Sequence, residues 1–181
     1  MLASGSPRRA DLLRAAGFSF SVRPAGVEEW PFCGGSPVSY AESLARAKAE
    51  AVRAGDDEVV LAADTVVVLD GSVLGKPGSA EEAAEMLRRL SGRRHDVVTA
   101  VAVLRGGVLR CGHDRALVTF RSLGPDEIAA YVASGEPLDK AGAYAIQGGA
   151  AGFVERLEGC RDTVVGLPVG LLRELLPRLG C

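Results

Sequence analysis

The chain is poor in lysine and histidine. Its 181 residues include 18 arginines but only three lysines and two histidines. A bias toward arginine would replace a lysine that only adds solubility, so the remaining lysines are candidates for sites that need a compact ammonium rather than a planar guanidinium. His95 and His113 cannot form a metal cage by themselves, although either could act as a single ligand or base. We expect both histidines to be ordinary solvated or strand-end residues.

Other features that the sequence lacks exclude several classes of function. The four cysteines form no CxxC pair, which argues against a zinc site and leaves them as free thiols: Cys33, Cys111, Cys160 and Cys181. The net charge of −2 and the pI near 5.8 provide no basic surface for nucleic acid. No apolar run approaches the roughly 20 residues of a membrane span, and no basic segment precedes an apolar stretch at the start. We therefore expect a cytoplasmic protein without nucleic-acid or membrane partners.

The length and composition are those of an ordinary globular protein. The chain is 48% hydrophobic and 24% charged. A chain of this size can bury roughly 70% of its unfolded surface in one core, so we expect a single domain over residues 1–181.

Helix and strand patterns alternate along the chain. Ser6-Pro7 and Ser36-Pro37 each predict a helix start, and Ser79-x-x-Glu82 is a capping box. The expected helices run from residue 7 to a stop at Gly17, over 41–54, 79–90 and 125–133, and onward from 168. The expected strands cover residues 1–4, 18–23, 59–69, 72–74, 96–104, 108–121 and 153–157. This alternation predicts an α/β fold with an extended mixed sheet.

Asp64 is the outstanding acidic residue, because it interrupts an apolar run from Val59 to Leu69. A carboxylate in a buried strand costs several kcal/mol unless another group pairs with it. Asp64-Thr65 could simply turn the chain at a strand end. The alternative that we favour is a carboxylate that binds a divalent cation or takes a proton from water.

Two of the three lysines lie in segments that favour anion binding. Lys48 shares a helix face with Leu44 and Val52, so its ammonium rises from the side expected to be buried and needs an anionic partner. A lysine that snorkels at the edge of this face is the alternative. Lys76 lies in the turn Gly75-Lys76-Pro77, which is not a P-loop. Taken alone, Lys76 would be a solvated turn residue.

The N-terminal segment Ser4-Gly5-Ser6-Pro7-Arg8-Arg9 is suited to phosphate. It combines two hydroxyls, the free amides of a helix start and two guanidinium groups. A plain capped helix with an exposed basic first turn is the alternative. Basic residues in a first helical turn oppose the helix dipole, which lowers the weight of that alternative.

Six ordered motifs resemble the Maf family of nucleoside triphosphate pyrophosphatases, and together they span nearly the whole chain. They are Leu2-Ala3-Ser4-Gly5-Ser6-Pro7-Arg8-Arg9, Ala63-Asp64-Thr65-Val66, Gly75-Lys76-Pro77, Leu90-Ser91-Gly92 followed by His95, Asp139-Lys140-Ala141-Gly142-Ala143-Tyr144 with Ile146-Gln147-Gly148, and Val165-Gly166-Leu167-Pro168. The resemblance implies a cytoplasmic enzyme that cleaves between the α and β phosphates of a nucleoside triphosphate with a divalent cation, Mg²⁺ or Mn²⁺. It also implies a long twisted mixed sheet, flanked by helices and split by a central cleft, as in inosine triphosphate pyrophosphatases.

The resemblance also implies roles for individual residues. Asp64 matches the proposed proton acceptor, and Glu28 matches an acidic residue that helps Asp64 hold the cation. The positions on the phosphate side are Ser4, Ser6, Arg9, Lys48 and Lys76. Cations and amide donors at such positions would stabilise charge on the phosphoryl oxygens. Asp139 and Lys140 belong to a motif without a derived role; they could close the cleft with an ion pair or contact the substrate.

The branch of the family is indicated by Arg8, Thr65 and Gln147. These residues match the branch acting on dTTP and UTP, whereas the branch acting on 7-methyl-GTP has an aromatic residue, Gln and Glu. A glutamine amide can present a donor and an acceptor to the edge of uracil or thymine. The expected substrates are therefore dTTP, UTP and modified pyrimidine triphosphates.

A nucleotide-binding regulator of septum formation, acting through a protein partner, is the alternative function. A pure binding module would not need a buried carboxylate beside a phosphate site, because that charge repels the ligand. The enzyme is therefore favoured. A symmetric homodimer is the base-rate expectation for its assembly.

Overall fold

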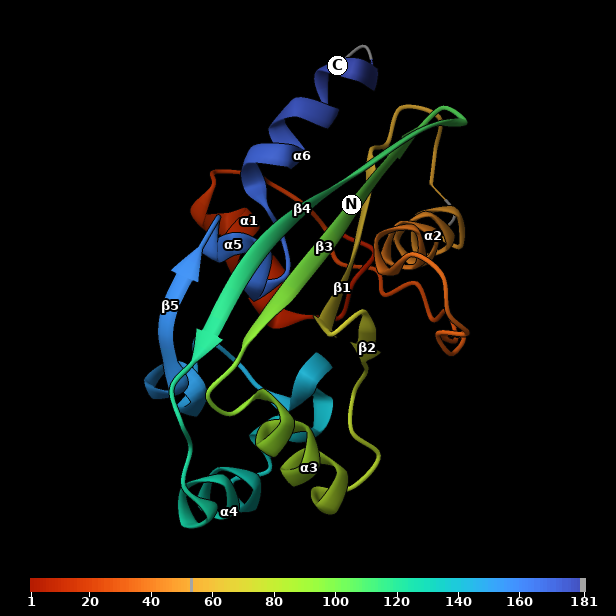
Figure 1. Cartoon of the computed structure of the whole chain (residues 1–181). Coiled ribbons are helices and arrows are strands. Elements are labelled where there is room, and N and C mark those ends of the chain that lie inside the picture. The colour runs from red at the N-terminus through yellow and green to blue at the C-terminus, as the bar shows by residue number, and fades with distance from the viewer. Residues whose placement is uncertain (53, 180–181) are drawn as a thin grey trace. The chain divides into compact units, whose positions relative to one another are not determined.

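The computed structural model describes residues 1–52 and 54–179, in which helices and strands alternate as the sequence predicts (Figure 1). The helices are α1 (Pro7–Ala15), α2 (Pro37–Glu50), α3 (Ala80–Leu90), α4 (Pro125–Ala133), α5 (Arg161–Val165) and α6 (Val169–Leu175). The strands are β1 (Val60–Leu69), β2 (Ser72–Leu74), β3 (Arg94–Arg105), β4 (Val108–Phe120) and β5 (Val154–Glu158). Short 3₁₀ turns include η1 (Glu136–Asp139), η2 (Ala141–Ala143), η3 (Gly149–Phe153) and η4 (Pro177–Leu179). The chain is thus an α/β protein.

Across the described residues the strands form one five-stranded sheet in the order β2-β1-β3-β4-β5. This sheet is antiparallel, so the expectation of a mixed sheet is wrong for these strands. For the pairs β1–β2 and β3–β4 the reason is local, since the turns at Asp70-Gly71 and Gly106-Gly107 are too short to connect anything but antiparallel neighbours. Isolated parallel bridges join Leu2 to Val22 and to Leu61.

The chain divides into two compact units. The first takes the described residues within 1–65, 99–114 and 166–181, and the second takes residues 66–98 and 115–165. Strands β1, β3 and β4 contribute residues to both units. A single domain over 1–181 stays a prediction, and so does the central cleft.

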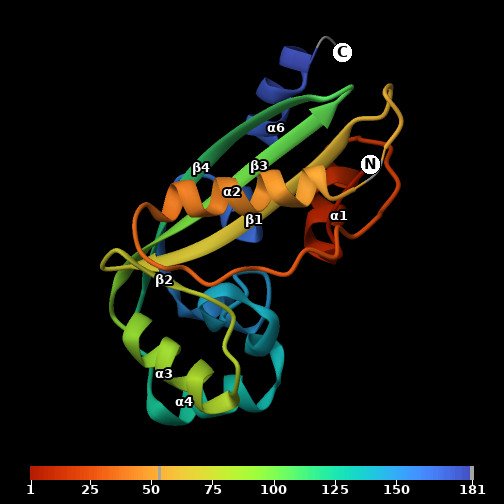
Figure 2. The ribbon, with the colours of Figure 1, turned by 90° about the vertical axis from the view of Figure 1, so that its right-hand side faces the viewer.

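The core of the first unit follows the two-residue alternation of its strands. Leu61 and Ala63 of β1 and Val101 of β3 pack with Leu13 of α1 and Leu172 of α6. Residues between them point to the opposite face of the sheet, where α2 lies over β1 (Figure 2). This alternation decides which helix faces Asp64.

The second unit is built on helices α3 and α4, which pack against each other and against the 3₁₀ turns η1 and η2. A cluster of aromatic rings fills its interior, with edge-to-face contacts among His95, Phe120, Tyr131, Tyr144 and Phe153. His95 lies at the start of β3, which agrees with a strand-end position, but its exposure of 2% excludes a solvated one.

Several segment predictions need correction. Residues 18–23 form no regular strand and contribute one bridge at Val22. Helix α2 ends at Glu50, earlier than expected, and α5 was not predicted. Cys33, Cys111 and Cys160 are free thiols, as expected, whereas Cys181 lies outside the described residues. Among the described helices, none has the length and apolar character needed to span a bilayer.

Candidate active site

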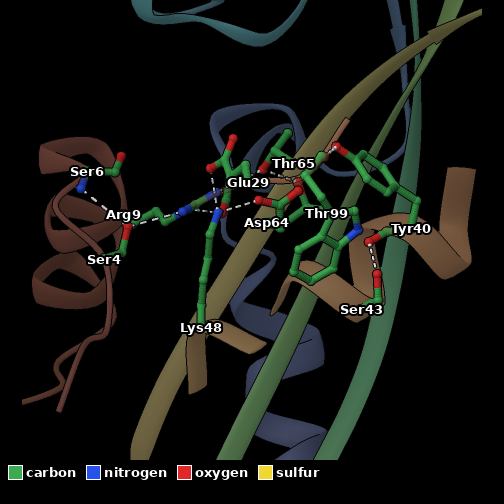
Figure 3. Close-up of polar contacts among 12 residues, drawn as sticks. Ser4, Ser6, Arg9, Glu29, Tyr40, Ser43, Lys48, Asp64, Thr65 and Thr99 are labelled. Atoms are coloured by element: carbon green, nitrogen blue, oxygen red, sulfur yellow. Dashed lines mark hydrogen bonds and ion pairs between the residues drawn. The ribbon is translucent and has the colours of Figure 1, made fainter. Parts of the chain in front are cut away.

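Asp64 and Lys48 form a nearly buried ion pair in the first unit (Figure 3). Lys48 Nζ lies 2.6 Å from Asp64 Oδ1, and the two side chains are 12% and 8% exposed. Asp64 is on β1 and points to the face covered by α2, so the buried face of α2 supplies its partner. Lys48 does rise from the buried side of its helix and meets an anion there, although Val52 lies beyond the end of α2. The alternative of a snorkelling lysine is thereby excluded.

The surroundings of Asp64 act on its pKa in opposite directions. Burial, which disfavours the charged carboxylate, raises the pKa of Asp64 above its usual value. The positive charges of Lys48 and Arg9 oppose this effect. A carboxylate with a raised pKa is a better proton acceptor than an ordinary aspartate, provided that it stays ionised at the working pH.

Glu29 is a second carboxylate partner of Lys48. Its Oε1 accepts a hydrogen bond from Lys48 Nζ at 2.7 Å, so one ammonium is shared between two carboxylates. The resemblance to the Maf family implies a metal-binding role for the neighbouring Glu28; Glu28 and Glu29 are both exposed. Two adjacent glutamates in Val27-Glu28-Glu29 give no sequence signal for which of them reaches Lys48, and in the structure it is Glu29.

The carboxylates of Asp64 and Glu29 suit a divalent cation. They already hold the cationic Lys48 Nζ between them. Among the described residues no group of three or more His, Cys, Asp or Glu could form a complete protein cage. Mg²⁺ is nevertheless commonly held by one or two carboxylates together with substrate phosphates and water. The donor set therefore fits a cation that binds with a phosphate substrate.

Arg9 links the N-terminal turn to β1 and to the segment between α5 and α6. Its guanidinium donates hydrogen bonds to Ser4 Oγ at 3.0 Å, to Thr65 Oγ1 at 3.3 Å and to the Gly166 carbonyl at 2.9 Å. Thr65 Oγ1 also lies 2.9 Å from Thr99 Oγ1. Burial lowers the pKa of Arg9, but an arginine stays cationic in proteins. The side chain is therefore fixed in orientation by neutral acceptors.

The start of α1 keeps hydrogen-bonding groups for a ligand. Ser6 occupies the N-cap position, but its hydroxyl makes no capping hydrogen bond with the described residues. The Ser6 amide points to Ser4 Oγ at 3.3 Å. Arg8 and Arg9 are both half-buried, and the first turn of α1 carries no acidic residue. These features favour an anion at this turn over a helix built for stability alone.

Lys76 and Gln147 belong to the second unit, and both are exposed. Lys76 follows Gly75, whose carbonyl accepts a hydrogen bond from the Gly142 amide at 3.0 Å. Lys140 forms an ion pair with the adjacent Asp139. The structure thus brings five of the predicted residues together in the first unit: Ser4, Arg9, Lys48, Asp64 and Thr65. Lys76 and Gln147 lie in turns of the second unit.

Sequence reasoning gave no role to three residues that contact Lys48, Thr65 or Arg9: Glu29, Thr99 and Gly166. Thr99 did have a signal, because it interrupts the apolar run of β3 as Asp64 interrupts that of β1. Gly166 has a φ of +119°, and a Cβ there would lie 3.4 Å from Arg9 Nε. This close approach of Gly166 to Arg9 joins segments that are far apart in the chain, so no local sequence pattern predicts it.

In this α/β chain a buried carboxylate paired with lysine lies beside a basic helix start. The model of the family described as "Maf-like protein" matches residues 1–179, and the chain belongs to that family. It is 51% identical over 184 residues to a dTTP/UTP pyrophosphatase of Pelotomaculum thermopropionicum, covering 99% of this chain and 96% of the relative. It is also 51% identical over 183 residues to a dTTP/UTP pyrophosphatase of Moorella thermoacetica, covering 99% and 94%.

Solved structures show the same fold at lower sequence similarity. The Ham1 protein of Staphylococcus aureus has a TM-score of 0.52 and 17% identity, and the match covers 98% of this chain and 97% of that one. A HAM1 protein from Coxiella burnetii has a TM-score of 0.50 and 15% identity over the same shares. At this level of identity, these matches show a similarity of fold alone.

Proposed function

We propose that the protein is a nucleoside triphosphate pyrophosphatase that hydrolyses dTTP and UTP to the monophosphate and pyrophosphate. The observation that carries this proposal is the buried Asp64 that Lys48 and Arg9 surround with positive charge. The dTTP/UTP pyrophosphatases that are half identical to this chain support the choice of substrate.

In the proposed reaction, the carboxylate of Asp64 takes a proton from water while the water oxygen attacks the α-phosphorus. The bond from the α-phosphorus to the oxygen that bridges to the β phosphate breaks, and pyrophosphate leaves with that oxygen. Lys48 keeps Asp64 ionised and, with Arg9, offers positive charge to the phosphoryl oxygens. Ser4 holds Arg9 in place, and Ser6 and the free amides of α1 add neutral donors.

A divalent cation, when bound, would neutralise phosphate charge, and Asp64 and Glu29 are the residues that would hold it. Because Lys48 donates hydrogen bonds to both carboxylates, at least one of these bonds has to break or lengthen when a cation binds. Glu28 lies next to Glu29 and remains a second candidate for the same role.

Recognition of the base is assigned to Arg8, Thr65 and Gln147, and Lys76 is assigned to phosphate. Thr65 also has a second proposed role, which is to orient Arg9, because its hydroxyl forms hydrogen bonds with both Arg9 and Thr99. A change at Thr65 would therefore alter the orientation of Arg9 as well as any contact with the base. Modified pyrimidine triphosphates are included among the proposed substrates, because the same polar edge of the base is recognised.

The test is hydrolysis of a nucleotide panel by the purified protein with Mg²⁺ or Mn²⁺, scored for pyrophosphate. We expect dTTP and UTP to be cleaved faster than CTP, purine triphosphates and 7-methyl-GTP. No pyrophosphate from any pyrimidine triphosphate would overturn the proposed reaction. A preference for 7-methyl-GTP would leave the reaction class intact and overturn the roles of Arg8, Thr65 and Gln147.

A further inference from the structure

We propose that Glu136 is a positioning residue that sets base preference by holding the turn that presents Gln147. This inference rests on the proposed function, in which Gln147 recognises the pyrimidine base. All residues of the argument lie in the second unit.

Gln147 occupies the third position of a tight turn. The Gly148 amide donates to the Ala145 carbonyl at 3.0 Å, which closes a four-residue turn over Ala145, Ile146, Gln147 and Gly148. Ile146 is buried and Gln147 is exposed. The direction of the Gln147 side chain is therefore set by how the two ends of this turn are fixed.

The first end of the turn is fixed by the aromatic core. The Ala145 amide donates to the Tyr131 hydroxyl at 3.1 Å, and the hydroxyl of Tyr144 lies 2.9 Å from His95 Nε2. Tyr131 and Tyr144 are 7% and 6% exposed. Tyr131 and Tyr144 are part of the buried core of this unit. Their contacts therefore restrain the first end of the turn, but they also stabilise the fold as a whole.

The second end is fixed by Glu136. Glu136 Oε2 accepts a hydrogen bond from the Gly149 amide at 2.9 Å, directly after the turn. Its carboxyl group also lies against Gly148, where an added Cβ would come within 1.6 Å of Glu136 Oε1. Only a glycine permits this approach.

The chain is shaped to bring Glu136 to this place. Gly135 has a φ of +74°, and the Glu136 amide donates to Ser134 Oγ at 3.3 Å, so the start of η1 is locally fixed. Two consecutive glycines after Gln147 would otherwise leave the backbone free to choose among many conformations. The carboxylate of Glu136 supplies the restraint that the missing side chains do not. If the turn were not restrained, Gln147 would be held less accurately. This would weaken its interaction with the base, which depends on geometry, more than it would lower the stability of the fold.

The experiment measures kcat and KM of the full chain for UTP, dTTP and CTP. Glu136→Ala removes the acceptor, and Gly148→Ala displaces the carboxylate while keeping its charge. We expect either variant to lower the preference for UTP over CTP by about tenfold, chiefly through KM for UTP. Glu136→Gln keeps an oxygen that accepts from Gly149 and should retain most of the preference. Glu155→Ala, an exposed glutamate on β5, is the matched control.

A double-variant comparison separates positioning from a general loss of structure. Glu136→Ala combined with Gln147→Ala should discriminate no worse than Gln147→Ala alone, because both act through the same side chain. An unchanged UTP-to-CTP preference in folded Glu136→Ala or Gly148→Ala would overturn the inference, as would additive losses in the double variant. Loss of preference in Glu136→Gln equal to that in Glu136→Ala would also overturn it. A wild-type protein that releases no pyrophosphate instead overturns the proposed function.

Discussion

The ammonium of Lys48 lies 2.6 Å from the carboxylate of Asp64, and both side chains are almost fully removed from solvent. A buried carboxylate of this kind is expensive to maintain, and a fold selected for stability alone would replace the pair with apolar residues. The charge on Asp64 is therefore better explained by chemistry at this site than by folding.

Asp64→Asn tests whether that charge is catalytic. The amide has nearly the same shape but cannot take a proton from water. We expect kcat for dTTP and UTP to fall by at least about 100-fold, the size of a lost general base. Asp11→Asn, at an exposed residue of α1, should keep wild-type rates and serves as the control. Comparable rates for Asp64→Asn and the wild type, measured as pyrophosphate release, would remove Asp64 from the mechanism.

Lys48→Met tests the electrostatic coupling between the two residues. Burial raises the pKa of Asp64, and the Lys48 charge opposes that rise, so the pKa of Asp64 should be higher still in the variant. In the proposed reaction the ionised carboxylate is the active form, so the acidic limb of kcat/KM should move to higher pH. The profile of kcat/KM against pH for UTP measures this shift. An acidic limb at the wild-type position would mean that Lys48 does not control the ionisation of Asp64.

Lys48→Arg tests the need for a compact ammonium. The nitrogen of Lys48 fits between Asp64 Oδ1 at 2.6 Å and Glu29 Oε1 at 2.7 Å in a position with 12% exposure. A planar guanidinium keeps the charge but is larger and bonds in a fixed fork. We expect turnover to fall by about tenfold with the protein still folded. Unchanged kcat and KM would show that positive charge alone is sufficient there.

Much of this site was predictable because its signals are local. Asp64 stands out as an acid in an apolar strand, and the helical spacing of Leu44 and Lys48 places the lysine on a buried face. The helix starts at Pro7 and Pro37 and the hairpin at Asp70-Gly71 follow from capping and turn chemistry.

The features that escaped prediction depend on contacts between distant segments. The sequence does not tell which of Glu28 and Glu29 reaches Lys48, because the loop that carries them has no repeating pattern. The expectation of a mixed sheet was wrong for a similar reason. The short turns after β1 and β3 are local signals, but β1 pairs with β3 and β4 with β5 across long connections, so the sequence does not tell the relative direction of those pairs. The segment at 18–23 has a strand-like composition but, within the described part of the chain, forms a single bridge, from Val22 to Leu2.

Gly166→Ala tests the support of Arg9. Gly166 has a φ of +119°, and an added Cβ would lie 3.2 Å from Thr65 Oγ1 and 3.4 Å from Arg9 Nε. We expect a loss of about 1–3 kcal/mol in the free energy of unfolding and a higher KM for UTP as Arg9 is displaced. Gly170→Ala is the matched control, since a Cβ there meets no atom within 4 Å among the described residues and α6 should gain helix propensity. Denaturant unfolding and steady-state kinetics check both expectations, and a Gly166→Ala protein as stable as the wild type would contradict the first.

His95 is expected to make the protein sensitive to acid. Burial lowers the pKa of His95 to about 4, from 6.5 for an exposed histidine. Between these values the unfolded chain binds a proton that the folded chain does not, so stability falls as pH decreases from 6.5 to about 4. A difference of about 2.5 pH units corresponds to about 3 kcal/mol from this residue alone.

His95→Gln cannot titrate but retains a group that can bond the Tyr144 hydroxyl, 2.9 Å from His95 Nε2. The free energy of unfolding of the variant should therefore decline less steeply over this range than that of the wild type. Parallel declines in urea titrations at pH 7, 6, 5 and 4 would show that His95 is not the group that binds the proton on unfolding.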